Sequence, residues 1–196
     1  MLPEKQFKKI MSFHPCYSLP EMNKLRSQCS CYSDILNISI AHKDLLWLAV
    51  NLCPSPKQKQ LFVVRLAVTV APIHNKKHPN DSRVKDCIVV TRRYIKNDAT
   101  SKELIKARND AYAATYAADA ATYAATYAAA YAADAAYAAG ATYAATYATC
   151  AADAAATYVA TYAADAAAYA ADIIKKQRSL CGTILRNLDK KEGSKG

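Results

Sequence analysis

The chain has 196 residues, enough for one domain or two small ones and for a buried hydrophobic core. Its 26 Lys and Arg residues against 16 Asp and Glu residues give a formal net charge of +10. With only 4 glycines and no GxGxxG, GxxxxGK or HExxH motif, a glycine-rich phosphate loop is excluded. The apolar runs, such as LFVV at 61–64, which Arg65 interrupts, are far short of the roughly 20 residues of a membrane span, so we expect a soluble protein without a membrane partner.

Several helix starts are marked in the first half of the chain. Ser18, Leu19 and Pro20 lead into a helix predicted over 21–28, and Asp44 starts an apolar helical run. Ser55 then offers an N-terminal cap, and the proline after it suits the first turn of a helix over 57–73. These signals predict that the first part of the chain consists of short helices.

The next helices are also delimited by capping residues. The β-branched run 63–70 is compatible with a strand, but we prefer a buried helix because an isolated strand has no pairing partner. The segment 80–82 can cap the following helix, and Asn97 ends it. Thr100 and Glu103 match a capping box that opens a helix running into an alanine-rich region.

Charge and composition divide the chain into three parts. Residues 1–110 carry 19 basic and 9 acidic side chains. Residues 111–172 carry 5 acidic side chains and no basic one, and residues 173–196 carry 7 basic and 2 acidic side chains. The middle part contains 35 alanines and 11 tyrosines and no proline, which favours helix strongly. We therefore expect one all-α domain, with a basic helical head over 1–100 packed on an alanine/tyrosine-rich helical hairpin and terminal helix over 101–188. A disordered tail is predicted over 189–196.

Tyrosines recur along the alanine-rich part at helical spacing. At about 100° per residue, the tyrosines and aspartates between 112 and 137 fall within about a third of the helix circumference. Beyond Gly140 this stripe changes face, and one unbroken helix over 111–172 has a length of about 93 Å. We therefore predict a bend near Gly140 between two arms, each about 45 Å long.

The tyrosine stripe has two interpretations. The rings either pack the arms against the head, or part of the stripe is exposed and recognises a partner, since tyrosine is frequent in binding hot spots. The tyrosines assigned to partner binding are Tyr123, Tyr127, Tyr131, Tyr158 and Tyr162.

Four segments in this order resemble immunity proteins of the Imm-5-like class, an alanine-rich helical type common in bacteriophage genomes. They are DLLWL at 44–48, RLAVTVAPI at 65–73, HPNDSRVKDCIVVTRRYI at 78–95 and SKELIKARNDAYAA at 101–114. The resemblance covers residues 40–175. It implies an all-helical protein that acts by binding a host or toxin protein, as an inhibitor or anti-defence factor in the cytoplasm of the host cell.

Two basic clusters support an alternative function in nucleic-acid or signalling-nucleotide binding. They are either solvated surfaces, or they hold phosphates while nearby tyrosines stack on bases. The clusters consist of Arg92, Arg93 and Lys96, with Tyr94 on the same helix, and of Lys175, Lys176 and Arg178. Self-association is left open by the sequence.

Metal binding and catalysis have weak signals. The pairs His14-x-Cys16 and Cys29-x-Cys31 are spaced more closely than the ligand pairs of structural zinc sites. No third group completes a Cys/His nucleophile. The 7 cysteines are scattered, and no apolar signal segment follows Met1, which favours reduced thiols in a cytoplasmic protein. We therefore predict a protein that is not an enzyme and uses no metal or cofactor.

Overall fold

The structure is a computed structural model that describes residues 1–13, 15, 17–115, 120–137, 151–154 and 164–193. Within these ranges the chain forms helices and no strand, so the predicted all-α class is confirmed. The elements are α1 (Glu4–Met11), α2 (Leu19–Gln28), the 3₁₀ helix η1 (Tyr32–Asn37), α3 (His42–Leu52), α4 (Pro56–Lys77), α5 (Arg83–Ile95), α6 (Ser101–Thr115), α7 (Ala120–Tyr137) and α9 (Ala164–Gly193). None of the helices in these ranges is both long and apolar enough to cross a membrane.

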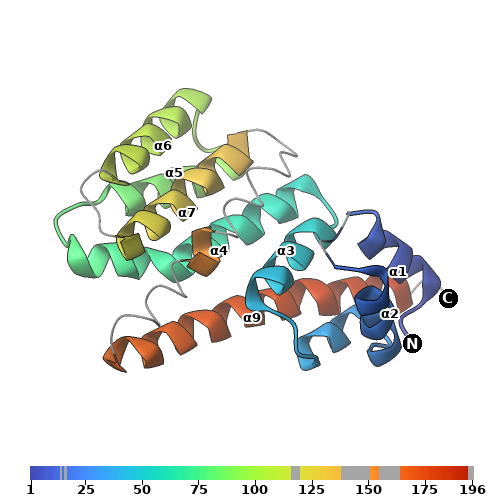
Figure 1. Ribbon diagram of the computed structural model, residues 1–196. Helices are drawn as coiled ribbons and strands as arrows, with labels where there is room; N and C mark the ends of the chain where they lie inside the picture. The colour runs from blue at the N-terminus through green and yellow to red at the C-terminus, as the bar shows by residue number, and fades with distance from the viewer. Residues whose placement is uncertain (14, 16, 116–119, 138–150, 155–163, 194–196) are drawn as a thin grey trace.

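Helix α4 connects two groups of helices (Figure 1). On one side it packs with α5 and α7, which contact each other and α6, and on the other side it meets α3 and α9. Helix α9 also lies along α3 and η1, and its last turns lie at the same end of the molecule as α1. Helices of the predicted head thus pack directly on the alanine-rich helix α7 and on the terminal helix α9.

The helix ends follow the predicted caps. The Ser55 hydroxyl accepts a hydrogen bond from the α4 backbone. Thr100 and Glu103 form the predicted capping box. The Thr100 backbone N–H donates to Glu103 Oε2 at 2.7 Å, and the Glu103 backbone N–H donates to Thr100 Oγ1 at 3.2 Å. Asn97 follows α5 with a φ of 66°, a left-handed conformation that asparagine tolerates better than most residues. The run 63–70 lies inside α4, so the preference for helix over strand is confirmed.

The first part of the alanine-rich region is not one straight arm. Helix α6 ends at Thr115, α7 begins at Ala120, and the two helices pack side by side. Tyr112 and Arg108 of α6 both contact Asp134 of α7. In one continuous helix, the 22 residues between Tyr112 and Asp134 would separate them by about 33 Å. The predicted unbroken arm is therefore wrong, because tertiary contacts and not alanine propensity decide where these helices end.

Six alanines in the second half of α7 lie inside the helix bundle. The Cys87 thiol of α5 donates to the Ala129 carbonyl at 3.6 Å, and the Gln60 amide of α4 donates to the Ala136 carbonyl at 2.9 Å. These side chains reach the α7 backbone because alanine carries only a methyl group there. The buried alanines of α7 are Ala128, Ala129, Ala130, Ala132, Ala133 and Ala136.

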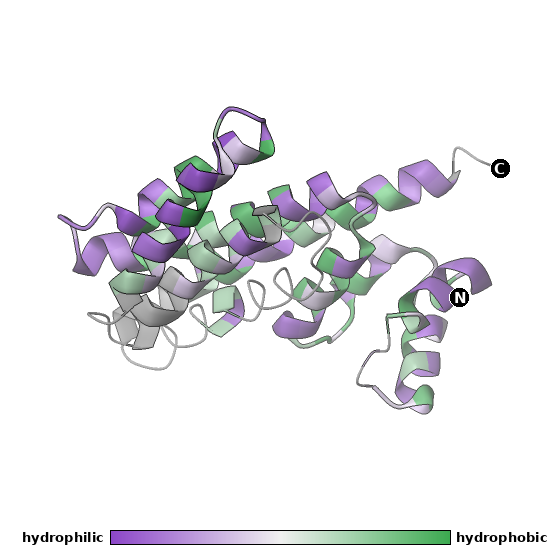
Figure 2. Ribbon diagram, turned by 90° about the horizontal axis from the view of Figure 1, so that it is seen from above, coloured by the Kyte–Doolittle hydropathy of each residue, from purple (hydrophilic) through white to green (hydrophobic). Residues whose placement is uncertain are grey.

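The disordered tail predicted over 189–196 is wrong as far as Gly193, because α9 continues to that residue. The last turns of α9 are largely hydrophilic (Figure 2), which is why the sequence suggests disorder. The Asp189 carboxylate nevertheless accepts hydrogen bonds from the backbone N–H groups of Tyr32 at 2.9 Å and Ser33 at 3.0 Å. A residue at the end of the chain thus caps the 3₁₀ helix η1.

We expect Asp189→Ala to lower the free energy of unfolding by about 2 kcal/mol, because two backbone N–H groups of η1 lose their acceptor. Urea denaturation measures this change. The exposed neighbour Lys190 provides the control, and Lys190→Ala is expected to stay within about 0.5 kcal/mol of the unmodified protein. Equal stability of the Asp189→Ala variant and the unmodified protein would contradict the capping role.

Candidate functional site

One exposed side of α5 carries three basic side chains. Lys85 and Arg92 of α5 and Lys96, the C-terminal cap of the helix, are exposed and lie seven and four residues apart, which places them on one side over about 16 Å. Val89 lies between them on the same side and is 46% exposed. We call these four residues the α5 face. The opposite side of the helix is buried and contains Val84, Cys87, Ile88, Thr91 and Ile95.

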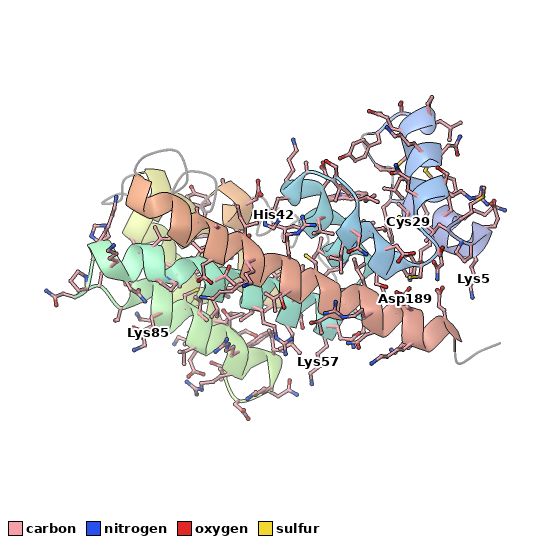
Figure 3. All side chains as sticks on the ribbon, turned by 90° about the horizontal axis from the view of Figure 1, so that it is seen from below. Lys5, Cys29, His42, Lys57, Lys85 and Asp189 are labelled. Carbon is pink, nitrogen blue, oxygen red and sulfur yellow. The ribbon has the colours of Figure 1, made fainter. Side chains whose placement is uncertain are left out.

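The cations of the α5 face are available to a molecule from outside. Within the described part of the chain, none of the three takes part in an ion pair or a side-chain hydrogen bond. The nearby Asp86 carboxylate accepts a hydrogen bond from Ser82 at 2.6 Å, one turn earlier on the helix. In Figure 3 the labelled Lys85 lies at the outer surface of the helix bundle.

Arg93, predicted as part of the same basic cluster, has a different role. Its guanidinium donates to the Asp98 carbonyl at 2.9 Å and lies 3.6 Å from the Glu103 carboxylate. Arg93 thereby links the end of α5 to the start of α6. Lys85 is not part of the predicted cluster, although its helical spacing from Arg92 is the signal that identifies it.

The second predicted basic cluster does not act as one surface. Arg178 is half-buried and donates to the Leu36 carbonyl at 2.8 Å, which links α9 to η1. Lys176 forms an ion pair with Asp172 at 2.6 Å, one turn earlier on α9. Lys175 is exposed. Two of the three side chains thus have partners within the chain.

The described tyrosines of the predicted stripe pack between α6 and α7. The Tyr112 ring lies 5.4 Å from the Tyr127 ring and 6.1 Å from the Tyr131 ring, both in edge-to-face geometry. The Tyr112 hydroxyl donates to Asp134 at 3.0 Å, and Arg108 pairs with the same carboxylate at 2.8 Å. Burial raises the pKa of the Tyr112 hydroxyl, and the charge of Asp134 adds to this. We call the three rings the tyrosine trio, which joins two helices of the chain.

Several predicted residues have no described side chain. Tyr123 lies on α7, but the placement of its side chain is not described. Tyr158, Tyr162 and the predicted bend near Gly140 lie outside the described residues. The role of these three tyrosines in partner binding stays a prediction.

A buried histidine lies at the corner between α4 and α5. His74 is 1% exposed, its Nε2 lies 3.6 Å from Asp81 Oδ2, and its ring lies 5.0 Å from that of His78. Asp81 accepts hydrogen bonds from the Arg83 backbone N at 3.0 Å, Nε at 2.9 Å and Nη2 at 2.6 Å. Hydrogen bonds from Arg83 lower the pKa of Asp81 to about 2. The predicted cap over 80–82 is therefore provided by Asp81.

A groove runs between α2 and the segment 37–41. It has a volume of about 500 Å³, and Met22, Leu25, Ile38 and Ile40 form its apolar part. Glu21 and Lys24 also line the groove and carry opposite charges, so the groove favours neither an anion nor a cation.

Metal ligands do not gather in the described ranges, where no three His, Cys, Asp or Glu side chains are placed to hold an ion. Of the Cys and His pairs weighed as zinc ligands, Cys29 is buried and Cys31 is half-buried, and both are free thiols. His14 and Cys16 lie outside the described residues.

Comparisons of the chain with protein-family models, with curated proteins and with solved structures find no match.

Proposed function

We propose that this protein is a non-enzymatic binding protein that holds a nucleic acid by its phosphates through the α5 face. The observation that supports this function is the row of Lys85, Arg92 and Lys96, exposed on one side of one helix. Phosphate contacts depend on positive charge at the surface, and the net charge of +10 strengthens the attraction of a polyanion.

The shape of the α5 face favours an extended ligand. The face is the outer side of a helix and not a hollow, whereas small ligands are usually enclosed in a cleft. Its cations extend over about 16 Å, and each strand of a duplex presents a phosphate about every 3.4 Å along its axis. A row of this length spans several phosphates, and contacts to phosphates position a duplex without reading its sequence.

A protein partner is the second candidate, as the resemblance to immunity proteins implies. Val89, 46% exposed among the three cations, is the observation that favours it. An apolar side chain surrounded by positive charge suits an acidic protein that combines carboxylates with an apolar contact. In this case the same α5 face binds a host or toxin protein and inhibits it.

Charge reversal tests the α5 face. We expect the triple variant Lys85→Glu, Arg92→Glu, Lys96→Glu to bind a random-sequence DNA duplex at least tenfold more weakly in fluorescence anisotropy. The slope of log K against the logarithm of the salt concentration is expected to become less negative by about 3, because three phosphate contacts are lost. The helical circular dichroism signal checks that the variant is folded.

A matched control separates the α5 face from net charge. The variant Lys5→Glu, Lys24→Glu, Lys190→Glu changes three exposed lysines outside α5 by the same total charge. It is expected to lose less than threefold in affinity. Equal losses in both variants, or duplex binding that does not respond to salt, would contradict the proposed function.

Affinity capture from a bacterial lysate distinguishes the two candidate partners. Nucleic acid that disappears after nuclease treatment supports the first candidate. A protein that survives nuclease, binds the control variant and is lost with the α5 variant supports the second candidate and overturns the first.

A further inference from the structure

We infer that the corner between α4 and α5, residues 74–83, is an acid-sensitive contact that opens when His74 takes up a proton. This inference is independent of the proposed function, since none of the residues of the α5 face belongs to the corner. It rests on the position of one buried imidazole among charged neighbours.

The closed corner fits a neutral His74. The side chain is 1% exposed, and neither ring nitrogen forms a hydrogen bond of ordinary distance and angle with a described residue. The distance of 3.6 Å from Nε2 to Asp81 Oδ2 is too long for a hydrogen bond. A neutral imidazole has one N–H group, which can face Asp81. Its other nitrogen carries a lone pair and no hydrogen, so it is not a donor in search of an acceptor.

An imidazolium at His74 has a carboxylate, that of Asp81, at ion-pair distance. Asp81 is the carboxylate that faces it, and that carboxylate is already bonded three times to Arg83 of α5. His78, at the end of α4, and Arg83 both oppose a positive charge on His74. Burial lowers the pKa of His74, and Asp81 and the Asn75 side chain offset only part of this effect.

Protonation adds a second donor that the closed corner does not satisfy. An imidazolium donates from both nitrogens, and Nδ1 has no acceptor among the described residues. A buried charged donor without an acceptor is strongly unfavourable, whereas an open corner exposes both nitrogens to water. The segment 78–82 can move away from α4 because it is a surface connection beside a hollow lined by Lys77, His78, Pro79, Asn80, Asp81 and Arg83.

The sign of the pH dependence follows from the direction of the pKa shift. Because the pKa of His74 is lower in the folded than in the unfolded chain, the unfolded chain binds more protons below about pH 6.5. The contribution of His74 to stability is therefore complete above pH 6.5. This contribution is lost as the pH falls from 6.5 toward the lowered pKa of His74 in the folded chain, and the corner opens in this range.

NMR titration of the intact protein tests the inference, because the chain has only 4 histidines. We expect the His74 Cε1 proton to titrate below about pH 6.5. At the same midpoint, backbone amide signals of 79–84 are expected to lose their chemical-shift dispersion, while those of α3 keep it. Titration of His74 at or above pH 6.5, or unchanged amide signals across its titration, would overturn the inference. The second result is expected if Asn75 rotates to accept the Nδ1 proton.

Two variants assign the response to one ring. His74→Phe keeps a planar ring of similar size without a titrating group, and its 79–84 amide signals are expected to stay dispersed down to pH 5. His78→Gln removes the neighbouring imidazole, and the opening is expected to persist. If His74→Phe does not fold, the titration of the unmodified protein still decides. Loss of the opening in His78→Gln would overturn the assignment to His74.

Discussion

Replacing Gln177 by leucine is expected to lower the free energy of unfolding by about 3 kcal/mol. The Gln177 side chain is fully buried, and its Oε1 accepts a hydrogen bond from His42 Nε2 at 2.7 Å. Its Nε2 donates to Thr69 Oγ1 at 3.0 Å and to the Ala152 carbonyl at 3.4 Å. Leucine fills a similar volume but has no polar atom, so the partner groups of His42, Thr69 and Ala152 lose their hydrogen bonds to Gln177. Each unsatisfied buried polar group costs about 1–3 kcal/mol.

Urea denaturation followed by Trp47 fluorescence measures the effect of Gln177→Leu. The control is Asn187→Leu, an amide replaced on the exposed side of the same helix, and it is expected to change stability by less than about 0.5 kcal/mol. A Gln177→Leu protein as stable as the unmodified chain would show that the network contributes nothing to the junction of α3, α4 and α9.

The sequence does not predict this network. Gln177 stands in the run KKQR, which has the composition of a solvated helix face. Its partners His42 and Thr69 lie more than 100 residues away and reach it only because α3 and α4 pack on α9. Burial of a polar residue depends on such long-range contacts, which local pattern does not contain.

Helix ends, in contrast, follow from local chemistry. The caps at Ser55, Thr100 and Glu103 satisfy N–H groups within a few residues, so the sequence is sufficient to predict them. The end of α6 at Thr115 is different, because alanine, tyrosine, threonine and aspartate occur on both sides of it. Composition is equally helical before and after this end, so only the contacts between α6 and α7 determine the fold there.

The basic surface is partly predictable, because helical spacing is a local property of the sequence. Arg92 and Lys96 follow from the sequence as exposed cations. Arg93, their sequence neighbour, points about 100° away from Arg92 around the helix and bonds to the start of α6. Lys85 shares the α5 face at a distance of seven residues from Arg92. Helical period, and not adjacency in the chain, therefore determines which charges form the α5 face.

The second large effect is expected from the tyrosine trio. We expect Tyr112→Ala to lower the free energy of unfolding by about 3 kcal/mol, since it removes a half-buried ring between α6 and α7 and the hydrogen bond to Asp134. Tyr112→Phe keeps the ring and loses only the hydroxyl, so a loss of about 1 kcal/mol is expected. The difference between the two variants separates ring packing from hydrogen bonding.

A double-mutant cycle tests whether the rings act together within the chain. Tyr112→Ala and Tyr127→Ala are expected to couple by about 1 kcal/mol, since edge-to-face rings in contact stabilise each other beyond the area they bury. Lys102→Ala, on the exposed side of α6, is the control and is expected to show no coupling to Tyr112. If these tyrosines instead formed a recognition surface, Tyr127→Ala would leave the melting temperature unchanged and weaken partner binding. That result would contradict a packing role for the tyrosine trio and favour the tyrosine stripe over the α5 face as the site of partner recognition.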